Sequence, residues 1–288
     1  MNPTSALEKL PVARDIVVTL YRVIARAMIL GSGPRVLANS IPKAGTHLLT
    51  STLSKLPRMM HSGRHHTLPE FALPGSAEPD WGRVEHALSS VNRGQFATGH
   101  FPARRELSSL LQRLDYRTVF MLRDPRDVVV SNAFYIAKSK RHHRHQRFTT
   151  ELADADERLM ACIVGLPETA SGPALDSIGE RLRQYLPWRD DPTTHTCRFE
   201  GLIGPSGGGT IERQRQEIEA IAEHVGRRLS PEQIDRVARS SWSPRSSTFR
   251  RGEVGDWQNH FSDTHKVAFK QEAGHELIAL GYESNVDW

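Results

Sequence analysis

Cysteine is scarce in this sequence, with only Cys162 and Cys197 among 288 residues. The two lie far apart and lack the spacing of a zinc site, which argues against a disulfide framework and a structural metal. Long apolar runs are also lacking, because the most apolar stretch, residues 16–30, contains Arg22 and Arg26 and is too short to span a bilayer. We therefore expect a protein of a reducing, cytoplasmic compartment.

The interrupted apolar stretch has the pattern of an amphipathic helix. At helical spacing its polar positions align in one stripe opposite a wide apolar face: Asp15, Thr19, Arg22 and Arg26. We expect a helix within residues 14–30 that packs against its own domain, and a peripheral helix at the inner face of a membrane stays open as the alternative. No small-residue cleavage site follows, so the sequence predicts no secretory signal peptide.

Acidic residues are the minority among charged ones, because 38 Lys and Arg face 33 Asp and Glu and leave a net charge of +5. This balance favours an anionic partner, but it fits nucleotides, sulfated or acidic glycans, nucleic acid and anionic membranes equally. Hydrophobic residues make up 38% of the chain and include 10 Phe and 5 Trp, which is enough for a sizeable core.

Short apolar segments alternate with helical patterns along the chain. The expected strands are 35–40, 95–99, 117–122 and 195–199. The expected helices are 45–56, 103–113, 124–138, 151–164, 174–187, 210–226, 231–239 and 263–280. Capping patterns support two of these helices, since Ser230 and Ser262 stand at helix starts and Gly281 follows the last one. This order predicts a single α/β domain of three layers, with a central parallel sheet flanked by helices.

Three segments fit neither pattern: 57–94, 138–147 and 203–210. The Gly-rich segment "IGPSGGGT" at 203–210 indicates a flexible surface loop, since three successive glycines without a preceding strand make no phosphate cradle. The basic run "KSKRHHRHQR" at 138–147 is typical of a solvated face, although it could also form a lid over a negatively charged substrate.

The most informative stretch is "RVLANSIPKAGTHLLTSTLSKL" at residues 35–56, a strand, a turn and a helix. A helix N-terminus carries unpaired N–H groups and a partial positive charge, so this order can present Lys43 and backbone donors to an anion. The spacing departs from the usual nucleoside-triphosphate loop, because Lys43 precedes Gly45 and position 40 is serine. A surface turn with a solvated lysine is the plain alternative.

Two later stretches also combine arginine with phosphate-binding features. Arg123 ends the strand in "YRTVFMLRDPRDVVVSNAFY", and Ser131 lies two turns into the next helix, a reasonable clamp for a phosphate. Arg123 could instead simply pair with Asp127. In "STFRRGEVGDWQNHF", residues 247–261, glycines allow close approach to a ligand and Arg250 and Arg251 supply charge.

Together these stretches resemble the cytosolic-type sulfotransferases, which transfer a sulfuryl group from 3′-phosphoadenosine 5′-phosphosulfate (PAPS) and release PAP. The family motif P-K-[SA]-G-T is matched by Pro42-Lys43-Ala44-Gly45-Thr46, its arginine and serine eight residues apart by Arg123 and Ser131, and its motif R-K-G-x-x-G-D-W by Arg250-Arg251-Gly252-Glu253-Val254-Gly255-Asp256-Trp257. The resemblance spans about residues 35–281. It implies a P-loop NTPase-like topology, with an N-terminal helix in 1–33 and a sulfotransferase domain in 34–288.

The resemblance implies roles for individual residues. Lys43 and the backbone of residues 43–47, which end at His47, would hold the phosphosulfate and stabilise the leaving phosphate. Phe199 in "RFEGL" stands in the place of the family's tyrosine at the adenine, and Trp242 in "SSW" in the place of a ring that stacks on it. His100 in "FATGHFP" resembles the family's catalytic histidine and would be the general base.

Several positions depart from the family pattern. The family's lysine two residues before the histidine is Thr98, and a tryptophan often found beside the first motif is Leu48. Some glycan-modifying relatives use glutamate as the base, which makes Glu70 the reserve candidate. No short dimerisation motif follows Trp257, so the oligomeric state is left open. No metal is expected, because lysine, arginine and helix dipoles can balance the charge.

The expected acceptor is a hydroxyl compound, with basic loops and an amphipathic helix favouring a glycan, glycolipid or other amphiphile over a small phenol. One alternative is a nucleoside-triphosphate-dependent small-molecule kinase, whose magnesium only Asp124 or Asp127 could hold. Another is a basic nucleic-acid-binding module, which requires basic residues interleaved with aromatics on one face. The positive charge gathers instead at the expected phosphate sites and one His/Arg run, so we expect no nucleic-acid partner.

Overall fold

The computed structural model describes residues 33–76, 78–170, 172–241 and 252–288. In this part of the chain five strands form one sheet in the order β2-β3-β1-β4-β5, and every neighbouring pair is parallel. The strands are β1 (Arg35–Ser40), β2 (Met60–Thr67), β3 (Gln95–His100), β4 (Tyr116–Leu122) and β5 (Thr194–Arg198). The predicted α/β fold with a central parallel sheet is therefore confirmed.

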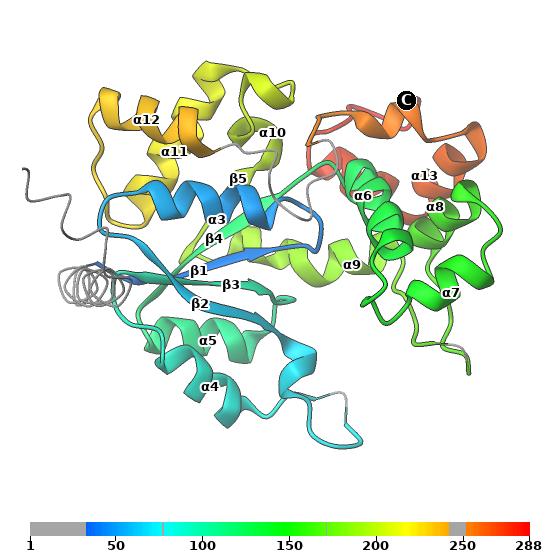
Figure 1. Cartoon of the computed structure of the whole chain (residues 1–288), viewed down its shortest axis with the longest axis horizontal. Helices are drawn as coiled ribbons and strands as arrows, with labels where there is room; N and C mark the ends of the chain where they lie inside the picture. The colour runs from blue at the N-terminus through cyan, green and yellow to red at the C-terminus, as the bar shows by residue number, and fades with distance from the viewer. Residues whose placement is uncertain (1–32, 77, 171, 242–251) are drawn as a thin grey trace, which may run out of the picture.

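Helices cover the sheet and extend beyond its carboxyl end (Figure 1). The α-helices are α3 (Thr46–Lys55), α4 (Trp81–Ser89), α5 (Arg105–Arg113), α6 (Pro125–Lys138), α7 (His145–Thr150), α8 (Ala155–Val164), α9 (Ile178–Tyr185), α10 (Phe199–Leu202), α11 (Ile211–His224), α12 (Pro231–Ser241) and α13 (Asp263–Ala279). Figure 1 shows α4 and α5 beneath the sheet, α3, α11 and α12 above it, and α6, α7, α8 and α13 gathered at one side.

The central strands are the predicted ones because they are apolar and buried on both faces. Val36, Leu37 and Ala38 of β1 have no exposed surface, and neither do Val119 and Phe120 of β4. Such continuous apolar runs are typical of parallel sheets covered by helices on both sides. The predicted caps are present too: Ser262 accepts from the His265 amide at the start of α13.

The unassigned segment 57–94 contains a strand and a helix. Strand β2 has the sequence MHSGRHHT, half exposed, with its register to β3 broken between His61 and His65. Because β2 is polar and irregular, its sequence lacks the apolar pattern that would predict a strand. A short 3-10 turn, η1 (Leu68–Phe71), and α4 follow.

The Gly-rich segment 203–210 lies partly at the surface, as expected, and forms a turn with buried glycines. It contains the 3-10 turn η3 (Pro205–Gly207), and the Gly207 carbonyl accepts from the Val254 amide at 3.0 Å. A Cβ on Gly207 would lie 2.5 Å from the Gly252 carbonyl oxygen, closer than real contacts allow. The glycines thus let this turn pack directly against the backbone of the last sequence motif.

Residues 1–32 and 242–251 lie outside the described part, and with them the expected helix at 14–30 and the ligand residues Trp242, Arg250 and Arg251. Among the helices that the structure does describe, none combines the length and apolar character needed to cross a membrane.

Candidate active site

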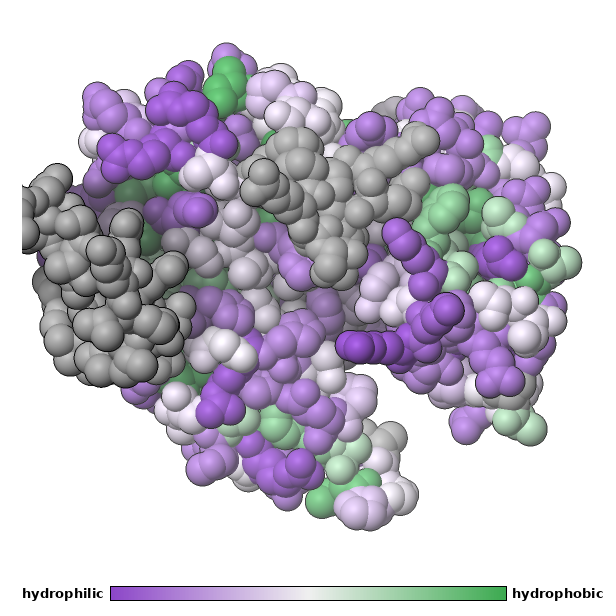
Figure 2. Space-filling view, viewed as in Figure 1, coloured by the Kyte–Doolittle hydropathy of each residue, from purple (hydrophilic) through white to green (hydrophobic). Residues whose placement is uncertain are grey.

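A cavity of about 1250 Å³ opens where the carboxyl ends of the strands meet. Figure 2 shows this face hollowed between the part that holds the sheet and the part that holds α6 to α8, with hydrophilic side chains at the rim. Residues at or just after the carboxyl ends of β1, β3, β4 and β5 line it, among them Lys43, His100, Arg123 and Phe199. In open α/β sheets this edge is the usual place for a ligand.

The turn between β1 and α3 is built for an anion. Lys43 has φ 75° and Gly45 has φ 116°, and a Cβ on Gly45 would lie 2.6 Å from Phe199 Cδ2. No side chain caps α3, and within the described residues the amides of Gly45, Thr46 and His47 donate to no protein group. The free amides can donate hydrogen bonds to an oxyanion, and the positive end of the helix dipole favours its charge.

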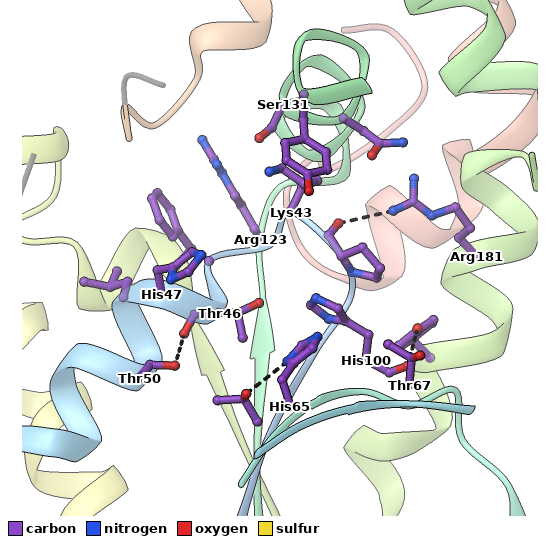
Figure 3. Close-up of a pocket in the computed structure, with 18 of the residues that line it drawn as sticks. Lys43, Thr46, His47, Thr50, His65, Thr67, His100, Arg123, Ser131 and Arg181 are labelled. Carbon is purple, nitrogen blue, oxygen red and sulfur yellow. Dashed lines mark hydrogen bonds between the residues drawn. The ribbon is translucent and has the colours of Figure 1, made fainter. Parts of the chain in front are cut away.

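The Lys43 side chain enters the same cavity (Figure 3). Its ammonium lies 3.7 Å from the centroid of the Tyr135 ring, a cation–π contact. Burial, and then the charge of Arg123, lowers the pKa of Lys43 to about 8. Its surroundings therefore disfavour the protonated form of Lys43, and a bound anion would stabilise that form.

Arg123 follows β4, buried to 7% exposure, and its guanidinium lies 4.2 Å from the centroid of the Phe199 ring. One nitrogen, Nη2, donates to the Glu253 carbonyl at 2.9 Å and lies 3.5 Å from Asp127 Oδ2. The contact with Asp127 that the sequence left open as an alternative therefore exists, yet Arg123 also lines the cavity. Its buried Nε has no hydrogen-bond partner in the described chain, which leaves a donor for a ligand.

Asp127 has a structural role that no sequence motif indicates. Its two carboxylate oxygens accept from the backbone amides of Gly255 at 3.0 Å and Trp257 at 2.9 Å. The buried carboxylate thus connects residues 255–257 to α6, and it also lies 3.5 Å from Arg123 Nη2. Gly252 of that motif lies in the cavity wall, and so does Ser131 of α6.

His100 ends β3 with a fixed orientation. Its Nδ1 lies 2.9 Å from the Ser40 carbonyl oxygen, which can only accept, so Nδ1 carries the proton and Nε2 keeps a free lone pair. Burial is the main reason that the pKa of His100 falls to about 4, opposed by the Ser40 hydrogen bond and assisted by nearby cationic groups. His100 is therefore neutral near pH 7, the state that a general base requires.

A second histidine lies beside His100. The rings of His65 and His100 meet edge to face with centroids 4.9 Å apart, and His65 Nδ1 lies 3.0 Å from Thr98 Oγ1. Thr98, which stands in place of the family's lysine, is thus engaged with β2. Glu70 contacts His66 Nδ1 at 2.5 Å and does not line the cavity, so its geometry gives no support to the role of reserve base.

The wall opposite β2 comes from the basic run at 138–147 and from α9. His142, His143 and Arg144 of the basic run line the cavity, and so do Arg181 and Tyr185 of α9. Arg181 Nη2 donates to the Pro42 carbonyl at 3.2 Å, and Tyr185 Oη donates to the His100 carbonyl at 3.2 Å. No motif marked Arg181 in the sequence, because an arginine inside an amphipathic helix usually faces solvent.

The carboxylates that a kinase would need for magnesium are already engaged. Asp124 pairs with Arg126 at 2.8 Å and caps α6, while Asp127 holds the last motif. Neither lines the cavity, where Asp176 is the single acidic residue of the described lining. Within the described residues no group of three His, Cys, Asp or Glu side chains is arranged to hold a metal ion.

Solved structures with the same fold share this architecture. A crystal structure of mouse sulfotransferase SULT7A1 complexed with PAP matches with a TM-score of 0.58 at 16% identity, covering 85% of this chain and 84% of that one. Retinol dehydratase in complex with androsterone and the inactive cofactor PAP matches with a TM-score of 0.55 at 17% identity, covering 84% and 80%. These likenesses confirm the predicted P-loop-like topology of the domain.

Curated relatives include two steroid sulfotransferases of Cavia porcellus. A 3-beta-hydroxysteroid sulfotransferase is 24% identical over 205 residues, which cover 63% of this chain and 64% of the relative. A 3-alpha-hydroxysteroid sulfotransferase is 25% identical over 173 residues, 53% of each. The chain thus spans less than two thirds of the length of both relatives. The model of the family described as sulfotransferase domain matches residues 34–279, most of the chain, and this protein therefore belongs to the sulfotransferase domain family.

Proposed function

We propose that the protein transfers the sulfuryl group of PAPS to an acceptor hydroxyl, with His100 as general base and Lys43 stabilising the leaving phosphate. One observation carries the proposal: the uncapped start of α3, Lys43, an unpartnered Arg123 Nε and the free Nε2 of His100 all belong to one cavity. These are a set of anion donors and a neutral base, which this transfer requires.

The residues present fit the donor molecule. The amides of 45–47 with Lys43 would hold the phosphosulfate end. Arg123 with Ser131 would hold the 3′-phosphate, since Arg123 Nε is a buried donor without a partner among the described residues. Phe199 would offer its ring to the adenine, and Gly252 allows close backbone approach. The PAP complexes among the structures of the same fold support this assignment.

Each residue of the site has a defined task in the transfer. The donor supplies a sulfuryl group attached to a phosphate that can leave. His100 Nε2 accepts the proton of the acceptor hydroxyl as its oxygen attacks, while Ser40 holds the opposite ring nitrogen. Lys43 and the amides at the start of α3 stabilise the negative charge that develops on the departing oxygen.

A hydroxyl compound is the acceptor that the relatives support, since two are named hydroxysteroid sulfotransferases. His61, His65 and Thr67 of β2 and the 142–144 segment would surround it. A glycan, a glycolipid or another amphiphile remains within this proposal. A cytoplasmic location with peripheral membrane contact through residues 14–30 likewise remains a proposal.

Calorimetric titration with PAP, beside ATP–magnesium as a control, tests the donor site. We expect tight PAP binding that Arg123→Ala loses and ATP–magnesium does not reproduce. The opposite ranking, with ATP–magnesium bound and PAP ignored, would favour the kinase alternative.

Two further variants separate binding from chemistry. Lys43→Ala should abolish turnover and weaken PAP binding, because both depend on the ammonium. His100→Ala should abolish turnover while PAP affinity stays nearly unchanged, since the base acts on the acceptor. A fully active His100→Ala enzyme would assign the base role to another group.

A further inference from the structure

Arg181 is a buried cation that forms no ion pair with any described residue. It is 7% exposed, its Nη2 donates to the Pro42 carbonyl, and its Nη1 has no hydrogen-bond partner in the described chain. Arginine does not lose its proton in proteins, so a buried donor without a hydrogen-bond partner lowers the stability of the fold. A cavity-lining guanidinium of this kind is suited to an anion that only a ligand brings.

The donor does not account for Arg181. The groups proposed for PAPS are Lys43, Arg123 and the start of α3, and Figure 3 shows Arg181 and Arg123 on opposite sides of Lys43. Tyr185, one turn after Arg181 on α9, donates to the His100 carbonyl at 3.2 Å, so α9 places Arg181 on the side of the cavity that holds the proposed base. Arg181 therefore lies on the side of the cavity that the donor does not occupy in this proposal, where the acceptor would bind.

A second arginine strengthens this positive region. Arg144 of the basic run lines the cavity, and its Nε donates to the Ala174 carbonyl at 2.9 Å. Arg181 lines the same cavity. Burial is the main reason that the pKa of Arg144 is lowered, opposed by the charge of Asp176 and assisted by that of Arg181. The nearby carboxylate, Asp176, accepts from Gln184 and forms no ion pair with either arginine in the described structure.

We infer that the acceptor carries an oxyanion, a carboxylate or a sulfate or phosphate ester, which Arg181 and Arg144 bind while its hydroxyl lies at His100. This inference rests on the proposed sulfotransferase function and narrows its substrate class. A neutral alcohol would leave both guanidinium charges without an ion pair among the described residues, whereas an anionic acceptor would supply one.

Matched pairs of acceptors test the inference on the full chain. Each pair is a hydroxy acid and its methyl ester: 4-hydroxybenzoic acid, 4-hydroxyphenylacetic acid and, for a more distant carboxylate, lithocholic acid. Binding to the PAP-loaded protein and kcat/KM with PAPS are measured for both members. We expect at least one acid to exceed its ester by about ten-fold or more, the range of a charge-assisted hydrogen bond.

Variants assign that preference to residues. Arg181→Met should reduce the acid-to-ester ratio to about one, Arg144→Met should reduce it in part, and Arg181→Lys should retain some of it. Arg183→Met is the matched control, because Arg183 is exposed on the same helix, pairs with Glu276, and lies outside the cavity. PAP titration shows that each variant is folded.

The outcomes are distinguishable. Esters equal to or better than acids in every pair, binding of neither member, or an unchanged ratio in Arg181→Met would each overturn the anionic acceptor while leaving the PAP site intact. Failure of the wild-type protein to bind PAP would instead overturn the proposed function, and this inference with it.

Discussion

The site residues are held in protonation states that depend on burial. His100 is neutral because its pKa falls to about 4, and Lys43 sits near its own transition because its pKa falls to about 8. Both shifts follow mainly from the loss of water around the charged form. Because kcat/KM reports groups of the free enzyme, these two values should appear in its pH dependence.

We predict that kcat/KM for PAPS falls on the acid side near pH 4, as His100 gains a proton, and on the alkaline side near pH 8, as Lys43 loses one. In Lys43→Arg the alkaline limb should move above pH 10, since a guanidinium keeps its charge. Steady-state rates from pH 4 to 10 measure this. An alkaline limb unmoved in Lys43→Arg would show that another group titrates there.

At the scale of elements, Gly45 couples the turn before α3 to α10. Its φ of 116° favours glycine, and the ring of Phe199 occupies the space of a Cβ. The same ring lies against Arg123, so β1, β4 and β5 meet at one point of the cavity. We therefore expect a larger residue at position 45 to displace the Phe199 ring and, with it, Arg123, which is proposed to bind the 3′-phosphate.

Gly45→Ala should lower the free energy of unfolding by about 2 kcal/mol or more, through backbone strain and the displaced ring. It should also weaken PAP binding. Gly63→Ala is the control, because Gly63 has φ 79° and nothing within 4 Å of a Cβ, so it should cost only about 1 kcal/mol. Urea unfolding and PAP titration compare the two, and equal losses in both would contradict the packing argument.

Most strands that sequence patterns predicted are uniformly buried. Strands β1, β3 and β4 are almost wholly buried, whereas β5, THTCR, is buried only at Cys197. Caps such as Ser262 use local hydrogen bonds that the sequence displays. Strand β2 is polar and irregular, so its pairing with β3 depends on partners far away in the chain. That Lys43, Arg123 and His100 line one cavity can be predicted from the sequence, because each lies at or after the carboxyl end of a parallel strand. The burial of Arg181 cannot be predicted in this way, because it depends on the packing of α9 against the turn at Pro42.

At the scale of the whole molecule, the buried cations of the site oppose the stability of the fold. Burial disfavours the charges of Lys43 and Arg181, and within the described residues Arg123 and Arg181 each keep a donor without a partner. A ligand that binds only the folded state and neutralises these charges must raise its stability. Donor affinity and thermal stability are therefore linked through the same residues.

We predict that PAP at 100 times its Kd stabilises the protein by about 2.7 kcal/mol, which raises Tm by about 5–10 °C. Without ligand, Lys43→Met should melt at or above the wild-type Tm near pH 7, because the folded state no longer holds a disfavoured charge, and PAP should shift it little. The variant's advantage should fade as pH rises from about 8 to the unfolded-state pKa of about 10.4, since wild-type Lys43 then becomes neutral in both states. Calorimetric scans measure this, and a constant advantage across that range would contradict the assignment of the charge to Lys43.

Strand β2 forms an edge of the sheet, paired with β3 on one side only. A sheet edge offers unpaired backbone groups to a strand of another molecule, which is a route to aggregation. Here the break in register after His61, the left-handed Gly63 and the exposed Arg64 interrupt that edge. Because this edge is neither straight nor apolar, a strand of a second copy cannot easily pair with it. We therefore expect the irregular β2 to disfavour edge-to-edge aggregation at high protein concentration.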